Sequence, residues 1–165
     1  MRYALVGGLA VSAWALPRAT RDADLWVELG DQRAQLEAAL GSAGFDVPAM
    51  EGELNKFGVF RSKDMATGVF VDIFDAVGPL GDAILSHRVE GQLADVRVWL
   101  ARADELAVLK VYSERRRDFD DLVALLKHAD VSTDYLREWA KQLDTSIGSD
   151  EVSERLARAL RQSQA

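Results

Sequence analysis

The feature of this sequence that most constrains its fold is a change in hydrophobic periodicity near Asp104. Before Asp104, short alternating or continuous apolar runs predict β-strands, whereas after it the apolar residues follow helical spacing. We therefore expect an α+β (α/β) protein, in which a mixed β-sheet is flanked by helices and followed by a helical C-terminal part. The 165 residues fit a single domain over 1–165, with the α/β core at 1–101 and the helical part at 102–165.

Local signals place individual elements along the chain. The expected strands cover 3–6, 22–29, 57–62, 68–76 and 96–100, and residues 63–67 are expected to form the turn of a hairpin. One helix is expected over 9–16, ending before Pro17, and a second is expected to begin with Asp31 as its cap. The expected C-terminal helices are 104–114, 117–129, 133–143 and 150–162.

Two glycines, Gly7 and Gly8, stand between the first strand and the first helix. Glycines at this place expose backbone N–H groups at the positive end of a helix, where a phosphate group binds well. A Gly-Gly pair also makes an ordinary turn, and the segment matches neither the GxGxxG fingerprint nor the P-loop. The pair therefore indicates a phosphate site only in combination with other residues.

Those other residues are acidic. Asp22 and Asp24 are two positions apart on an expected strand, so both side chains point to one face, where they repel each other unless a cation lies between them. Asp72 is a third acid, in an apolar strand where an isolated buried carboxylate costs several kcal/mol. A cap for Asp22 and a solvent-facing strand edge for Asp72 are the alternatives. Taken together, the three acids predict a magnesium site that aligns a triphosphate.

The amino-acid composition excludes some kinds of metal site and argues against a broad nucleic-acid-binding surface. The chain has no cysteine and only two histidines, His87 and His128, which excludes thiolate metal sites and argues against histidine-bound zinc. A net charge of −7 argues against a broad nucleic-acid surface, although Arg115–Arg117 form a local basic run that is usually a solvated helix face. No signal peptide or membrane span is visible, so we expect a cytoplasmic protein.

Over Tyr3–Leu126 the sequence resembles the nucleotidyltransferase superfamily with the polymerase-beta-like fold, and most closely the AbiEii-type toxin nucleotidyltransferases and related small bacterial proteins. The segments that carry the resemblance are GGLAV, RATRDADLWV, VDIF and DELAVLKVYSERRRDFDDL. Relatives usually have a helix before the first strand, whereas this sequence starts almost on that strand.

The resemblance implies roles for individual residues. It implies that Asp22, Asp24 and Asp72 bind Mg²⁺, with Mn²⁺ as an alternative, and that Gly7 and Gly8 bind the nucleotide phosphates. The implied catalytic residues are Asp22, Asp24, Asp72, Lys110 and Asp118, and Lys110 is also implied to contact the triphosphate. Asp121 falls with Asp118 on the downstream acidic motif.

Alternatives stay open for several of these residues. Lys110 also fits a helix lysine whose stem covers apolar neighbours. Asp118 and Asp121 equally fit acids of a helix N-terminus that pair with Arg115–Arg117. Arg18 and Arg21 lie just before Asp22 and are candidates for phosphate contacts, although surface arginines are common.

The implied activity is transfer of a nucleoside monophosphate from ATP or another NTP to a hydroxyl acceptor, either an RNA end such as that of tRNA or a protein side chain. Many members of the family are toxins that have an antitoxin protein as partner. The competing hypothesis is a catalytically degenerate nucleotidyltransferase fold that binds nucleotide or a protein partner. The sequence identifies neither the acceptor nor the NTP.

Overall fold

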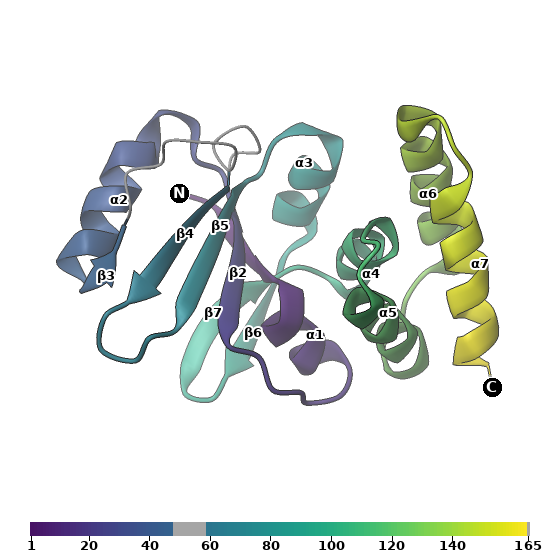
Figure 1. The fold of residues 1–165 in the computed structure, drawn as a ribbon, viewed down its shortest axis with the longest axis horizontal. Helices are drawn as coiled ribbons and strands as arrows, with labels where there is room; N and C mark the ends of the chain where they lie inside the picture. The colour runs from purple at the N-terminus through teal and green to yellow at the C-terminus, as the bar shows by residue number, and fades with distance from the viewer. Residues whose placement is uncertain (48–58, 165) are drawn as a thin grey trace. The chain divides into compact units, whose positions relative to one another are not determined.

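The computed structural model describes residues 1–47 and 59–164 (Figure 1). Within these residues one mixed sheet of seven strands has the order β3-β4-β5-β2-β1-β7-β6. The strands are β1 (Tyr3–Val6), β2 (Asp22–Val27), β3 (Phe45–Asp46), β4 (Val59–Asp64), β5 (Phe70–Asp75), β6 (Val89–Leu93) and β7 (Val96–Leu100). The helices are α1 (Gly7–Trp14), α2 (Arg33–Ser42), α3 (Gly78–His87), α4 (Ala103–Tyr112), α5 (Arg116–His128), α6 (Thr133–Ile147) and α7 (Glu151–Ser163). The expected mixed α/β class with a helical C-terminal part is confirmed.

The chain divides into two compact units. The sheet unit consists of Met1–Ala10 and Arg18–Ala101, and the helical unit consists of Val11–Pro17 and Arg102–Ala165. The division therefore falls inside α1 and again between β7 and α4.

The sheet unit has an apolar face and a polar face that carries the acids, because successive side chains of β2 and its neighbours point to opposite faces. On one face Val27, Leu29, Phe60 and Ile73 form a buried core. Leu36 and Leu40 of α2 pack against this core, together with Leu25. Alternation then places Asp22, Asp24 and Trp26 on the opposite face of β2, as the sequence predicts. Trp26 stacks there on Phe74 of β5, with ring centroids 6.3 Å apart.

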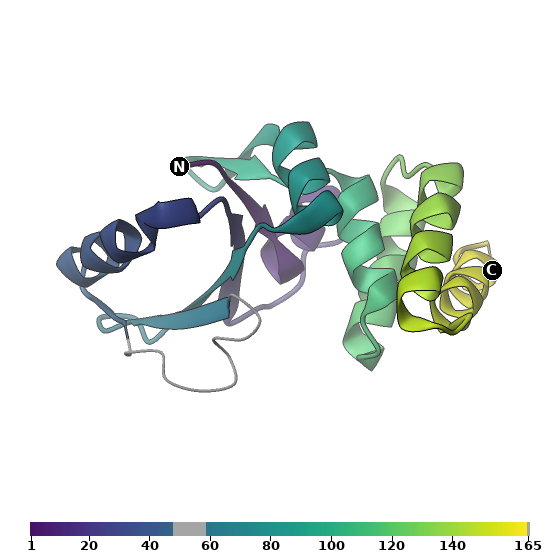
Figure 2. The ribbon, with the colours of Figure 1, turned by 90° about the horizontal axis from the view of Figure 1, so that it is seen from above.

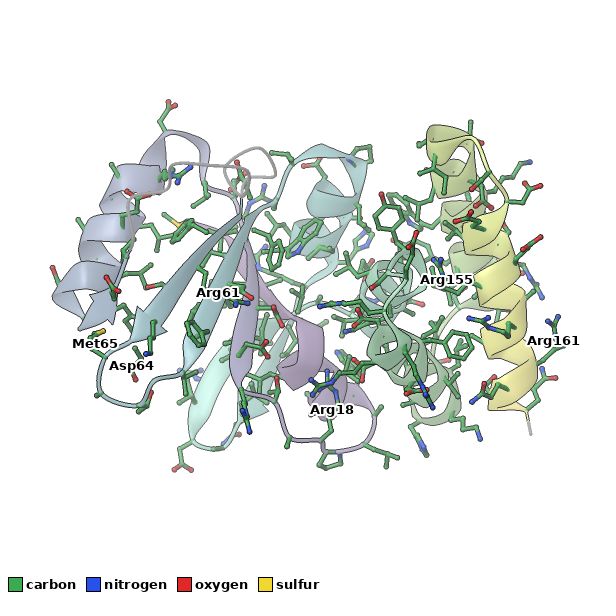
Figure 3. The ribbon with its side chains drawn as sticks, in the orientation of Figure 1. Arg18, Arg61, Asp64, Met65, Arg155 and Arg161 are labelled. Atoms are coloured by element: carbon green, nitrogen blue, oxygen red, sulfur yellow. The ribbon has the colours of Figure 1, made fainter. Side chains whose placement is uncertain are left out.

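Strand pairing sets which residues of this polar face are neighbours. β2 lies between β1, which pairs with it antiparallel, and β5, which pairs with it parallel. β4 and β5 form an antiparallel hairpin whose turn lies in residues 65–69, close to the expected turn at 63–67. Asp64 and Met65 mark this turn in Figure 3. The expected strand at 57–62 begins with residues 57 and 58, which lie outside the described residues.

Several local expectations need correction. Asp31 does not cap α2, because it lies in a short 3₁₀ turn (Gly30–Gln32), and α2 begins at Arg33 with no side-chain cap. The first helix begins at Gly7, two residues before the expected start, so both glycines belong to its first turn. Helix α3 and the strands β3 and β6 were not expected, since the α3 segment contains two glycines and a proline that read as a loop. Pro79 in the first turn of α3 is the signal for it, because proline is favoured there.

The helical unit contains α4 to α7, seen along the green-to-yellow part of the chain in Figure 2. Helix α4 is buried along nearly its whole length, and α5, α6 and α7 are amphipathic. The α6–α7 connection is tied by Asp144, whose carboxylate accepts hydrogen bonds from the backbone N–H groups of Val152 at 2.9 Å and Ser153 at 3.1 Å. These bonds satisfy amide donors in the first turn of α7. Among the described helices, none has the length and apolar character needed to cross a membrane.

Candidate functional site

Three aspartates lie on the polar face of the sheet unit. Asp24 of β2 and Asp72 of β5 are direct partners in the parallel β2–β5 pair, and Asp22 lies two residues before Asp24. Partner residues on neighbouring strands are about 5 Å apart, and their side chains share a face. We call Asp22, Asp24 and Asp72 the acidic row. The sequence predicts all three acids as parts of one site, and the parallel register of β2 and β5 brings Asp72 beside Asp24.

The start of α1 is built against the acidic row. A Cβ atom added to Gly7 would overlap the carboxylate of Asp24, and Gly7 also has a φ of +62°. Only glycine meets both conditions without strain, since L-residues with a side chain rarely adopt positive φ. A Cβ atom on Gly8 would lie 2.6 Å from an Arg18 guanidinium nitrogen and 3.0 Å from the Thr20 hydroxyl oxygen. The two glycines therefore let a carboxylate, a guanidinium and a hydroxyl approach the positive end of a helix.

A residue that the sequence analysis did not single out binds the third acid. Arg61 of β4 is the direct partner of Asp72 in the antiparallel β4–β5 pair. Its Nε and one terminal nitrogen donate to the two oxygens of Asp72, each at 2.6 Å (Figure 3). Asp72 is buried, whereas the Arg61 side chain is 52% exposed. These hydrogen bonds raise the pKa of Arg61, and the negative charges of Asp72, Asp22 and Asp24 add to the effect.

Asp22 also has a partner. The hydroxyl of Thr20 donates to its carboxylate at 2.5 Å. Arg18 lies beside α1 (Figure 3), near Gly8, whereas Arg21 is exposed. The structure thus brings Arg18 and Thr20 to the glycines and the acidic row, and Thr20 is a second residue that sequence reasoning missed.

The acidic row has the ligand type of a magnesium site but not its arrangement. Within residues 1–47 and 59–164, no three acidic or histidine side chains are arranged as a ready metal site. The row provides oxygen ligands on one face of two adjacent strands, which is the ligand type that Mg²⁺ prefers. Arg61 supplies positive charge at Asp72, where a metal ion would otherwise supply it. The residue types therefore fit Mg²⁺, and binding would need the side chains to move closer together and Arg61 to release Asp72.

Lys110, Asp118 and Asp121 lie together in the helical unit. The ammonium group of Lys110 pairs with Asp118 and lies 2.9 Å from an oxygen of Asp121, and all three side chains are buried. Asp118 also accepts from the Ser113 hydroxyl and from Arg115 Nε, each at 2.6 Å. We call Lys110, Asp118 and Asp121 the buried ion cluster.

The charges of the buried ion cluster compensate one another. Burial by itself raises the pKa of Asp118, but hydrogen bonds from Lys110 and Ser113 and the charges of Lys110 and Arg115 outweigh it, so that the pKa is lowered. The pairing of Asp118 with Arg115 agrees with the alternative in which this acid pairs with the basic run at a helix N-terminus. The ammonium group of Lys110 is not at the surface. The alternative in which the Lys110 stem covers apolar neighbours and its charge lies in water is therefore wrong.

The pairing of Arg61 with Asp72 depends on the register of the β4–β5 hairpin, in which Lys63 pairs with Phe70. Counting outward from the expected turn at 63–67 shifts this register by three residues and misses the pair. The sequence therefore predicts the hairpin but not the position of Arg61 beside Asp72. No local signal predicts that Lys110 is buried either, because that depends on how helices pack.

Comparisons with known proteins agree with this architecture. No family model and no curated protein matches the sequence. The antibiotic-resistance factor ANT(2″)-Ia matches in structure with a TM-score of 0.52 at 22% identity, covering 95% of this chain and 80% of that one. An antigenic nucleotidyltransferase-like protein from Paracoccidioides brasiliensis gives 0.55 at 17% identity, with 94% and 84% covered. A Helicobacter pylori protein provisionally described as a nucleotidyltransferase gives 0.55 at 15% identity, with 99% and 85% covered.

At these identities the likeness concerns the fold. A particular closeness to AbiEii-type proteins stays a prediction. The chain has the fold of nucleotidyltransferase-like proteins, and its acidic row lies beside a glycine-initiated helix in the sheet unit.

Proposed function

We propose that this protein is a nucleotidyltransferase that transfers a nucleoside monophosphate from an NTP to a hydroxyl acceptor and releases pyrophosphate. The observation that carries the proposal is the direct pairing of Asp24 with Asp72, beside a helix whose first residue is shaped around the Asp24 carboxylate. Two adjacent carboxylates with an anion-binding helix end suit a reaction in which a phosphorus centre is aligned and its charge is stabilised.

Each residue of the site has a distinct task in this proposal. The backbone N–H groups at Gly7 and Gly8 bind the β and γ phosphates, and Arg18 adds a guanidinium beside them. Asp22 and Asp24 would hold the metal, and Asp72 would complete its ligands and accept the proton of the acceptor hydroxyl. Bound Mg²⁺ would neutralise phosphate charge and position the triphosphate for in-line attack.

Arg61 controls whether Asp72 is available. While both Asp72 oxygens accept from Arg61, neither is free to bind a metal ion or an acceptor hydroxyl. In the active state Arg61 must therefore turn away from Asp72. Its side chain is half exposed, so water can solvate the guanidinium after this movement.

Lys110 and Asp118 are not part of the proposed catalytic site. The sequence resemblance implies that Lys110 contacts the triphosphate and that Asp118 is catalytic, and both roles stay predictions. The contacts of these residues favour a structural role, since the charge of Lys110 is already compensated by Asp118 and Asp121.

The same resemblance is the basis for two further proposals. One is that the protein acts in the cytoplasm, where NTPs and Mg²⁺ are available. The other is that it is the toxin of a toxin-antitoxin pair. Induced expression should then arrest growth, and the Asp24→Asn variant should not. Equal growth arrest by both proteins at equal expression would argue against a toxic transferase activity.

The second candidate function is a degenerate nucleotidyltransferase fold that binds nucleotide or a protein partner without catalysis. The Arg61–Asp72 ion pair favours this candidate, because a permanent arginine in place of the metal would leave nucleotide binding intact and remove the chemistry.

Two measurements distinguish the candidates. Melting temperature is measured with each non-hydrolysable NTP and Mg²⁺, since a ligand that binds only the folded state stabilises it. Transfer is then scored with labelled NTP, Mg²⁺ and total cell RNA or protein. A transferase shows both effects, and Asp24→Asn loses both, whereas the exposed Asp95→Asn control keeps both. Stabilisation without transfer supports the degenerate fold, and the absence of both effects contradicts nucleotide binding of either kind.

A further inference from the structure

An exposed aromatic ring lies next to the acidic row, on the same face of the sheet unit. Phe70 of β5 is 36% exposed, although it stands two residues before the buried Asp72 on the same strand. The Arg61 guanidinium carbon lies 5.1 Å from the centroid of the Phe70 ring, and the Lys63 ammonium nitrogen lies 5.8 Å from it. We call Phe70 and Lys63 the aromatic platform.

Strand register places the aromatic platform next to the acidic row. Phe70 is the direct partner of Asp22 on β2 and of Lys63 on β4. Because residues two apart on a strand are separated by about 7 Å, the ring stands one step along the strand from Asp72. A molecule that contacts the ring can therefore also reach the acidic row.

The two cations beside the ring differ in their availability. Arg61 is bound to Asp72. Lys63 is exposed, and within residues 1–47 and 59–164 it forms no ion pair with a carboxylate. Lys63 thus presents positive charge on a chain whose net charge is −7, so the attraction for anions is local rather than spread over the surface.

We propose that the aromatic platform binds the end of a single-stranded nucleic acid as the acceptor, which rests on the proposed transferase function. Arg61 lies over the Phe70 ring, so the movement that releases Asp72 also uncovers the ring. The terminal base then stacks on Phe70, its phosphate pairs with Lys63, and its sugar hydroxyl reaches Asp72. An aromatic ring beside a cation is the combination that binds single strands without sequence preference.

The same chemistry disfavours other acceptors. A hydroxyl on a protein side chain needs neither a stacking surface nor a phosphate contact. A nucleic-acid end uses both groups of the platform.

The test is binding of a short fluorescein-labelled single-stranded RNA, measured by anisotropy with Mg²⁺ and without NTP. A DNA oligonucleotide of the same sequence is the second probe, and the comparison of the two affinities identifies which nucleic acid is preferred. Phe70→Leu should weaken binding of the preferred strand roughly tenfold, whereas Phe70→Tyr keeps the ring and should bind as the wild type does. Lys63→Gln should reduce the slope of log affinity against log salt by about 0.7, the loss of one phosphate contact.

Two matched controls show whether the effect is local. Trp99 of β7 is also an exposed aromatic residue with a cation on its ring, since the Arg88 guanidinium carbon lies 4.8 Å from its centroid. Trp99→Leu and the exposed-lysine variant Lys127→Gln should leave RNA and DNA affinity unchanged. Circular dichroism confirms that each variant is folded.

The outcomes separate this inference from the proposed function. Wild-type affinity in folded Phe70→Leu, or equal weakening by Trp99→Leu, overturns the platform. Transfer of label only to protein, unaffected by Phe70→Leu, also overturns it while the transferase stands. Strand binding that depends on Phe70, in a protein that transfers nothing, supports the platform and contradicts the transferase.

Discussion

The acidic row and the buried ion cluster, both within the described residues, each hold a carboxylate against a cation, but they differ in charge balance and in exposure to solvent. In the buried ion cluster, Asp118 and Asp121 surround Lys110, and Arg115 adds a second positive charge. In the acidic row, three carboxylates share a face, and Asp72 pairs with Arg61. The Lys110 side chain is 7% exposed, against 52% for Arg61.

The difference shows which cluster is suited to a ligand. A buried and compensated set of charges holds its geometry, because removal of any member leaves an unpaired charge in a poorly solvated place. An excess of negative charge beside a half-exposed arginine can exchange that arginine for another cation. The same residue types therefore serve structure in the helical unit and, in our proposal, ligand binding in the sheet unit.

The largest effect is expected from Lys110→Met in the buried ion cluster. The variant keeps the apolar stem but removes the ammonium group from between the buried carboxylates of Asp118 and Asp121, of which Asp118 also pairs with Arg115, so the free energy of unfolding should fall by about 3–5 kcal/mol. Urea unfolding measures this, with Lys127→Met on the exposed side of α5 as the control. A loss below about 1 kcal/mol would show that the cluster is not structural and would return Lys110 to the nucleotide site.

Gly7→Ala should be the next most damaging change. A side chain at this position meets both the positive φ of +62° and the Asp24 carboxylate. We expect a loss of about 2–4 kcal/mol, the sum of the left-handed backbone and overpacking costs. Gly30→Ala is the matched control, because Gly30 has a φ of +46° with open space around it. Equal losses in urea unfolding for the two variants would mean that Asp24 does not crowd Gly7.

Acid should weaken the helical unit through Asp118. Because the folded-state pKa of Asp118 is lowered, its contribution to stability is complete above the pKa of the unfolded chain and disappears as pH falls through the folded value. The stability should therefore decrease below about pH 4, with a slope of at most about 1.4 kcal/mol per pH unit for this proton. Urea unfolding at a series of pH values should give a shallower acid slope in Asp118→Asn. An unchanged slope would assign the acid sensitivity to other groups.

The smallest change in stability is expected from Asp24→Asn, although its effect on binding is large. Loss of repulsion within the acidic row stabilises the variant, and loss of a negative charge at the start of α1 destabilises it. These opposing effects leave a net change below about 1 kcal/mol without metal. The stabilisation by Mg²⁺ with a non-hydrolysable NTP should disappear, as scanning calorimetry can measure. A strongly destabilised variant that keeps its response to Mg²⁺ and NTP would make Asp24 a structural residue.

The features that could be predicted from the sequence are those set by residues close together in the chain. The alternation in 22–27 by itself placed Asp22 and Asp24 on one face, opposite Leu25 and Val27, and the periodicity after Asp104 gave four helices close to their observed bounds. Helix α3 was missed because its glycines and proline outweigh its few apolar residues in a local reading. The Asp31 cap failed because a 3₁₀ turn precedes α2.

Local periodicity is a property of neighbouring residues, so the sequence by itself determined most of the strands and helices, though not β3, β6 or α3, and the shared face of the two aspartates on β2. Only the tertiary structure decided which residues from other parts of the chain lie next to them. The parallel register of β2 and β5 placed Asp72 beside Asp24, and the hairpin register placed Arg61 on Asp72. The packing of helices buried Lys110 between two carboxylates. Such contacts join residues distant in the chain, and a shift of one residue in register would turn the same side chains to the opposite face.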